Sequence, residues 1–192
     1  MSEQTSSIIS KVWGMCGPLR DDGVSYGDYL EQLTYLIFLK MSDEYAKPPY
    51  NKQTGIPAGY GWTDMNTLTG AELEGKYKAI LEKLGEQGGI LGQIFQGAIN
   101  KVSNAAILYR IVQMIDKEKW VSMSSDVKGE IYEGLLQKNA EDVKSGAGQY
   151  FTPRPLIQAM VACVRPEPMK TIADPCCGSG GFFLAAQSFL AD

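Results

Sequence analysis

Apolar residues recur at steps of three and four in several stretches of the chain, which is the pattern of amphipathic helices with one buried face. The clearest stretch is 25–45, and Ser25 followed three residues later by Asp28 is typical of a capped helix start. The same spacing predicts further helices over 71–84, 104–120 and 126–138. The first two thirds of the chain are therefore predicted to form a helical core.

A long loop is predicted between the first two of these helices. Residues 47–70 contain so many prolines and glycines that no regular element would tolerate them, and we expect Trp62 to pin this loop. The aromatic residues of 25–45 lie at helical spacing, so they are interpreted as core or subunit contacts rather than as base-stacking residues. The charged run 116–119 mixes both signs and is interpreted as a solvated face.

Composition narrows the chemistry of the chain. The 192 residues contain no histidine, which excludes His-ligated metal sites and Ser–His or Cys–His nucleophile pairs. We predict no metal site. A net charge of −4 argues against a broad basic face that grips nucleic acid. Two of the four cysteines are adjacent, which is poor for a disulfide framework, and no signal peptide or membrane span is expected. We therefore expect a cytoplasmic protein.

The composition turns polar and glycine-containing over 138–148, which indicates a domain boundary. We predict a helical N-terminal domain over residues 1–144 and a second domain that starts in 145–192. Its predicted elements are a helix capped by Thr152 and ended by Pro166, a short strand over 171–173, a glycine loop and a helix over 182–190. Strand, glycine loop and helix in this order are typical of the opening of an α/β nucleotide-type domain.

The glycine loop 174–181 allows close approach of a ligand, because glycines turn sharply and carry no Cβ. No Gly-Lys-Ser/Thr follows, so a phosphate-binding loop is excluded, and Phe183 stands where the dinucleotide pattern needs its third glycine. An acidic residue, Asp174, before a short glycine turn suits the ammonium group and methionine part of S-adenosylmethionine. A plain strand-to-helix turn remains the alternative.

A second group of residues lies at 145–154, where two glycines, an amide, two aromatics and a helix start follow one another. Such a segment can form one wall of a pocket and offer backbone N–H groups to a carboxylate. The alternative is an ordinary interdomain linker whose aromatics are buried. Composition alone does not separate these two interpretations.

Residues 148–154 (Gly-Gln-Tyr-Phe-Thr-Pro-Arg), followed by 174–182 (Asp-Pro-Cys-Cys-Gly-Ser-Gly-Gly-Phe), closely resemble motifs X and I of the adenine-specific DNA methyltransferases. Specifically, they resemble the modification subunit of type I restriction enzymes, and 33–41 and 132–136 also resemble that subunit. The resemblance implies a mainly α chain. Its helical N-terminal domain would be followed by the truncated start of a Rossmann-like α/β methyltransferase domain: first helix, strand, glycine loop and helix.

The resemblance also implies a cofactor, a set of binding residues and partners. The cofactor is S-adenosylmethionine, without a metal, and methyl transfer would go to the N6 amino group of adenine in double-stranded DNA. The implied partners are a specificity subunit, a restriction subunit and a second modification subunit, with no membrane. The implied cofactor-binding residues are Gln149, Tyr150, Phe151, Thr152, Pro153, Arg154, Asp174, Gly178, Ser179 and Gly180.

The family's catalytic motif, Asn-Pro-Pro-Tyr/Phe, does not occur in these 192 residues, so no catalytic residue is assigned. Lys47-Pro48-Pro49-Tyr50 resembles it but fails, because lysine cannot accept hydrogen bonds from an adenine amino group and the segment precedes the cofactor loop. We therefore expect the isolated chain to be inactive. The alternative function is a helical binding module for the specificity subunit, a partner subunit or DNA.

Overall fold

The structure, a computed structural model, describes residues 3–121, 152–178 and 180–191, and every regular element in these ranges is helical. The predicted helix over 126–138 lies outside the described residues. None of the described helices combines the length and apolar character needed to cross a bilayer. The elements are α1 (Glu3–Asp21), α2 (Tyr26–Ala46), η1 (Trp62–Asp64), α3 (Gly70–Gly85), α4 (Gly89–Phe95), α5 (Ala105–Asp116), α7 (Arg154–Val164) and α8 (Gly181–Ala191).

The chain divides into two compact units. One comprises Gly14–Met123, and the other comprises Met1–Trp13 together with Ser124–Asp192. Helix α1 contributes residues to both. The predicted domain boundary between residues 144 and 145 lies outside the described residues and stays a prediction.

Helix α2 begins where the sequence predicts. The Ser25 hydroxyl accepts a hydrogen bond from the Asp28 N–H at 3.3 Å and donates one to Asp28 Oδ2 at 2.6 Å. This cap satisfies an N–H group that the first helical turn would otherwise leave unpaired. Lys101 also binds the Asp28 carboxylate, so the 96–104 segment is fixed to the start of α2.

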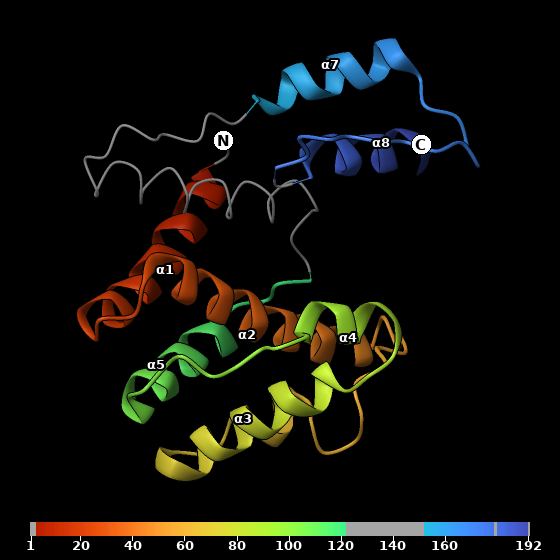
Figure 1. The fold of residues 1–192 in the computed structure, drawn as a ribbon. Helices are drawn as coiled ribbons and strands as arrows, with labels where there is room; N and C mark the ends of the chain where they lie inside the picture. The colour runs from red at the N-terminus through yellow and green to blue at the C-terminus, as the bar shows by residue number, and fades with distance from the viewer. Residues whose placement is uncertain (1–2, 122–151, 179, 192) are drawn as a thin grey trace. The chain divides into compact units, whose positions relative to one another are not determined.

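The core of the Gly14–Met123 unit forms between α2, α3, α4 and α5, which Figure 1 shows packed together. Phe95 of α4 stacks on Tyr35 of α2 at 5.0 Å and meets Phe38 edge-on at 5.5 Å between ring centroids. The fully buried Gln32 links two segments, because its amide donates to the Ile99 carbonyl and accepts from the Tyr77 hydroxyl. The aromatics of α2 that point inward are thus core residues, as their spacing predicts.

Trp62 pins the long loop, as expected. Its side chain is 1% exposed, it lies in the short helix η1, and its indole N–H donates to Asp116 Oδ1 at 2.6 Å. Lys40 donates to the same oxygen at 2.9 Å. The interpretation of 116–119 as a merely solvated face is therefore wrong for Asp116, which joins the loop to α2 and α5.

Helix α5 is shorter than the predicted range, ending at Asp116 instead of Trp120. Its start agrees with prediction, because Asn104 accepts from the N–H groups of Ala106 and Ile107. After Asp116 the chain folds back, and the indole of the buried Trp120 donates to the Ile115 carbonyl at 3.0 Å. The Trp120 side chain thus pairs a carbonyl at the end of α5 that further helix would have paired.

The sequence pattern does not predict α1 and α4. Gly14, Gly17 and Pro18 disfavour a helix in α1, and α4 begins within the glycine pair Gly88-Gly89. Met15 and Leu19 are nevertheless buried on one face of α1, and Phe95 is buried at the end of α4. Burial of apolar side chains outweighs weak helix propensity in both elements.

In the other unit, α7 and α8 pack side by side (Figure 1). Their shared core contains Ile157 and Val161 of α7 and Ala186 of α8, with Phe182 partly buried against them. The predicted cap at Thr152 is wrong, because the N-cap position is Pro153 and no side chain caps this helix. The helix ends at Val164, before Pro166, and Arg165 adopts a left-handed conformation.

The predicted strand over 171–173 is not formed. This segment is irregular, and the described residues contain no strand that would pair with it. A strand needs a hydrogen-bonded neighbour, so an apolar run alone does not make one. The first helix, the glycine loop and the last helix of the predicted α/β opening are present, but its strand is not confirmed.

Candidate functional site

The glycine turn predicted to contact a cofactor has the backbone that requires glycine. Gly178 and Gly180 have positive φ values of 53° and 78°, a region that residues with a Cβ rarely adopt. The Gly180 N–H donates to the Cys177 carbonyl at 2.8 Å and closes the turn. A Cβ at either glycine would meet no atom within 4 Å, so open space borders the turn.

Asp174 begins this turn. Its half-buried carboxylate accepts a hydrogen bond from the Cys176 N–H at 3.0 Å through Oδ1. This short-range bond fixes the side chain beside the turn instead of leaving it free in solvent. The carboxylate is thus held where a cationic group could approach it.

Arg154, the first residue of α7, lies against the start of α8. A Cβ on Gly181 would lie 3.2 Å from Arg154 Nη1 and 3.0 Å from Ile157 Cδ1, so only glycine fits there without displacement. Arg154 and Gly181 lie 27 positions apart in the sequence, so the two sequence motifs meet next to the glycine turn. Gly181 is a position that the sequence analysis did not assign. Its signal was the consecutive pair Gly180-Gly181.

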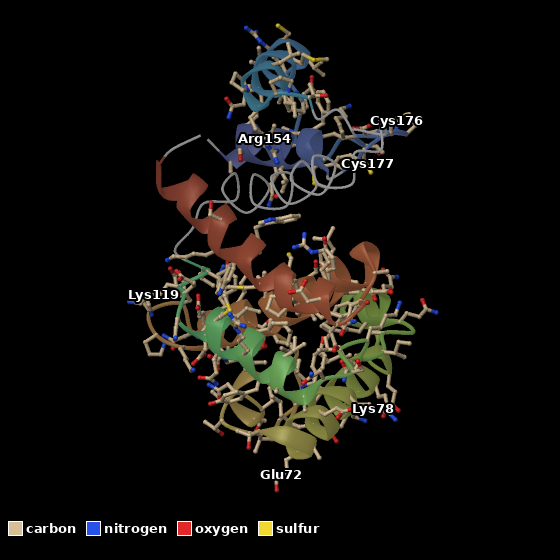
Figure 2. All side chains as sticks on the ribbon, turned by 90° about the vertical axis from the view of Figure 1, so that its left-hand side faces the viewer. Glu72, Lys78, Lys119, Arg154, Cys176 and Cys177 are labelled. Carbon is tan, nitrogen blue, oxygen red and sulfur yellow. The ribbon has the colours of Figure 1, made fainter. Side chains whose placement is uncertain are left out.

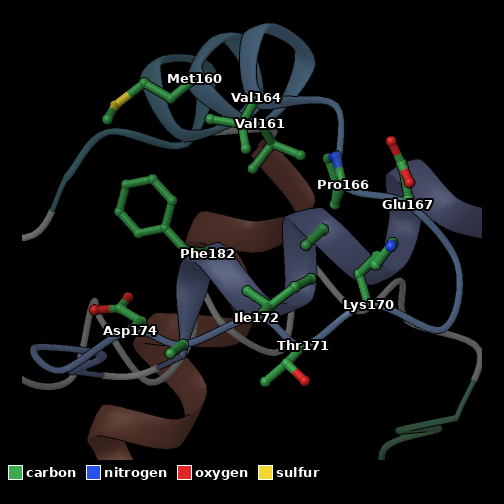
Figure 3. A pocket seen from close by; sticks show the side chains of 12 residues that line it. Met160, Val161, Val164, Pro166, Glu167, Lys170, Thr171, Ile172, Asp174 and Phe182 are labelled. Carbon is green, nitrogen blue, oxygen red and sulfur yellow. The ribbon is translucent and has the colours of Figure 1, made fainter.

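A cavity of about 470 Å³ lies between α7, α8 and the segment that joins them. Figure 3 shows the Phe182 ring reaching from α8 toward α7, with Ile172 beside the same space and Asp174 at its edge. Most of its lining is apolar and comes from Met160, Val161, Val164, Ile172, Phe182 and Ala186. Of the described residues predicted to bind the cofactor, Asp174 lines this cavity. Arg154, Gly178 and Gly180 lie outside its lining.

The charges of the site favour a ligand that carries both signs. A guanidinium and the positive end of the α8 dipole lie together at Arg154 and Gly181, which favours an anionic group. The Asp174 carboxylate favours a cationic group. A zwitterionic amino acid group matches this set, and the open space beside the two glycines leaves room for its backbone.

Two of the remaining candidates are described in the structure, and four are not. Thr152 and Pro153 are exposed and lie outside the lining of the cavity. Gln149, Tyr150, Phe151 and Ser179 lie outside the described residues. The proposed role of all these residues in cofactor binding stays a prediction.

Comparison with known proteins identifies the family. A family model described as the HsdM N-terminal domain matches residues 8–115, more than half of the chain. The chain belongs to the HsdM N-terminal domain family. A second model, described as N-6 DNA Methylase, matches residues 123–192. In sequence, this chain corresponds to the N-terminal portion of a type I restriction–modification methylase subunit, which confirms the family that the motifs indicate.

Curated relatives agree with this assignment. The type I restriction enzyme EcoKI methylase subunit of Escherichia coli K12 is 37% identical over 190 residues, and the StySPI methylase subunit of Salmonella potsdam is 36% identical over 190 residues. Each match covers 96% of this chain but 35% of the relative. The chain thus spans about a third of the length of these curated relatives. Because they are methylase subunits, the family favours a methyltransferase part over a stand-alone binding module.

Two solved structures have a related fold. The crystal structure of the EcoKI M protein matches with a TM-score of 0.52 and 28% identity, covering 96% of this chain and 32% of that one. A modification subunit from Vibrio vulnificus YJ016 matches with a TM-score of 0.76, covering all of this chain and 46% of that one. At 24% identity, the second match is evidence for the fold alone.

Proposed function

We propose that this chain is the cofactor-binding start of a DNA methyltransferase subunit that uses S-adenosylmethionine. The whole subunit would methylate the N6 amino group of adenine in double-stranded DNA, working with a specificity subunit, a restriction subunit and a second modification subunit. The names of the curated relatives and the N-6 DNA Methylase match support this proposal. The observation that carries it is the meeting of Arg154 with the start of α8, directly after the glycine turn.

The described residues suit the amino acid half of the cofactor. Arg154 and the N–H groups at the start of α8 would hold its carboxylate, and Asp174 would hold its ammonium group. Gly178 and Gly180 would let its methionine part pass close to the backbone. The other assigned residues, Gln149, Tyr150, Phe151, Thr152, Pro153 and Ser179, would complete the wall.

The residues proposed to surround the amino acid half of the cofactor would bind and orient it. When bound, the cofactor supplies a sulfonium methyl group that is already electrophilic, so no metal is needed. What these residues contribute is the alignment of that methyl group and the exclusion of other orientations, which is a large part of the catalytic effect in such transfers. The groups that hold the flipped adenine belong to the Asn-Pro-Pro-Tyr/Phe motif, which this sequence does not contain.

Calorimetric titration of the chain with S-adenosylmethionine tests the proposal. Asp174→Asn is expected to weaken binding by about 10-fold to 100-fold, since hydrogen bonds to charged groups contribute about 1.5–3 kcal/mol. Gly178→Val is expected to abolish binding, because valine does not tolerate a φ of 53°. Glu167→Gln is the matched control, since this exposed acid lines the cavity but lies outside the turn.

Equal losses of affinity in Asp174→Asn and Glu167→Gln would contradict the assignment of Asp174, because they would indicate a general effect of negative charge. Unchanged affinity in Gly178→Val would exclude the glycine turn from the site. Circular dichroism of each variant separates loss of binding from loss of the helices.

A further inference from the structure

Two thiols lie next to each other in the turn between Asp174 and α8. Cys176 and Cys177 are both free and exposed, and Figure 2 shows them on the loop beside α8. The hydrogen bonds that hold this turn come from its backbone and from Asp174. The Cys177 thiol lies 3.9 Å from the Gly178 carbonyl, a distance at which even a sulfur hydrogen bond is weak. Neither thiol is needed to keep the turn closed, and both are accessible to reagents.

The two cysteines are poorly placed to oxidise each other. Adjacent Cα atoms are about 3.8 Å apart across a trans peptide, whereas disulfides prefer Cα separations of about 4.4–6.8 Å. A bond between neighbouring cysteines is therefore strained and easily reduced. A small disulfide in solution is therefore a more favourable partner for either sulfur than the neighbouring cysteine.

We propose that Cys176-Cys177 is a thiol-modification site that accepts a low-molecular-weight disulfide and thereby closes the glycine turn to the cofactor. A cysteine Sγ, after giving up its proton, attacks one sulfur of the external disulfide. The S–S bond of that disulfide breaks as the new Sγ–S bond forms, and the departing half leaves as a thiol that takes up the proton. The cysteine is oxidised, the departing half is reduced, and an added thiol reverses the exchange.

The consequence for the cofactor rests on the proposed function. Cys176 and Cys177 lie between Asp174, assigned to the ammonium group, and Gly178, where open space borders the backbone. An adduct the size of a tripeptide attached there would occupy the space that the cofactor needs. The affinity of the turn for the cofactor would then depend on the ratio of thiol to disulfide in solution.

The other two cysteines serve as internal controls. Cys163 is exposed but lies in the last turn of α7, outside the glycine turn, so its modification should leave the cofactor site open. Cys16 belongs to the Gly14–Met123 unit and is buried, and this burial raises its pKa to about 12. Cys16 should therefore stay unmodified while the protein is folded.

The test treats the 192-residue chain with oxidised glutathione, locates adducts by peptide mass spectrometry and measures S-adenosylmethionine binding before and after treatment. We expect adducts on Cys176 or Cys177 and a loss of affinity of about tenfold or more, restored by dithiothreitol. The double variant Cys176→Ser/Cys177→Ser should keep its own affinity after treatment, even where Cys163 carries an adduct. Cys163→Ser should respond as the unaltered chain does.

Absence of an adduct on both turn cysteines, or unchanged affinity in a fully modified chain, would overturn the proposal. A peptide mass lower by two hydrogens would also overturn it, because it would show an internal disulfide. If the untreated chain does not bind S-adenosylmethionine, the proposed function is wrong. The proposed loss of cofactor affinity on modification is then wrong as well. The adduct map then decides by itself whether the modification site exists.

Discussion

Asp116 illustrates how one carboxylate can hold three segments together. Its Oδ1 accepts hydrogen bonds from the Trp62 indole and from Lys40, whose side chain is mostly buried. Burial raises the Asp116 pKa, but the hydrogen bonds from Lys40 and Trp62 outweigh it, and the pKa lies below its usual value of 3.8. The folded protein therefore stabilises the ionised form.

The sign of the pH effect follows from that lowered pKa. The stabilisation by Asp116 is complete above the unfolded-state pKa and is lost as the pH falls through the lower folded-state pKa. Asp116→Asn should lower the free energy of unfolding at neutral pH and flatten its decline between about pH 5 and pH 2. Urea unfolding across this pH range measures both effects. Glu72→Gln, which alters an exposed acid labelled in Figure 2 that has no contact with Asp116, is the control for the loss of one negative charge.

An Asp116→Asn profile parallel to that of the unaltered chain would show that this carboxylate does not contribute to acid sensitivity. At the residue scale, sequence reasoning recognised the Ser25 cap and the role of Trp62, because both depend on local signals. It missed Asp116, because the partners of a carboxylate 54 residues from Trp62 are not visible in a charged run.

At the scale of elements, the two glycines of neighbouring helices differ in what surrounds them. A Cβ on Gly92 of α4 would lie 1.8 Å from the Gln87 carbonyl oxygen, which leaves no room for a side chain. Gly75 of α3 is exposed, and a Cβ there would meet nothing within 4 Å. Both positions are helical, so the difference between them is one of packing.

This contrast predicts opposite effects of the same substitution. Gly92→Ala should destabilise the protein by about 1–3 kcal/mol, since the α4 backbone or Gln87 must shift. Gly75→Ala should stabilise it by about 0.5–1 kcal/mol, since alanine is the better helix former. Denaturant unfolding of the two variants compares them directly. Stabilisation by Gly92→Ala would mean that the chain approaches less closely there than the structure indicates.

Helix prediction succeeded where the apolar stripe was long, as in α2 and α3. It failed in α1 and α4, where glycine and proline interrupt the pattern and burial compensates. It also failed for Thr171–Ala173, because a strand depends on a partner that an apolar run does not specify. Element type was thus predictable where local propensity and burial agree.

At the scale of the whole molecule, the chain contains candidate cofactor residues but no catalytic Asn-Pro-Pro-Tyr/Phe motif. We expect the purified 192-residue chain to transfer no methyl group to DNA, because its sequence lacks the motif that accepts hydrogen bonds from the adenine amino group in this family. Incubation of unmethylated DNA with radiolabelled S-adenosylmethionine measures this. Incorporation of label above a protein-free control would refute the expectation and point to a catalytic group elsewhere in these residues.

The sequence by itself determined the family, the order of the motifs and the main helices, because apolar periodicity, caps and short motifs are local properties. Only the tertiary structure decided that Arg154 meets Gly181 beside the glycine turn and that Asp116 joins Trp62 to Lys40. Such contacts join residues far apart along the chain. They depend on how the helices pack, and that packing is set by many side chains together.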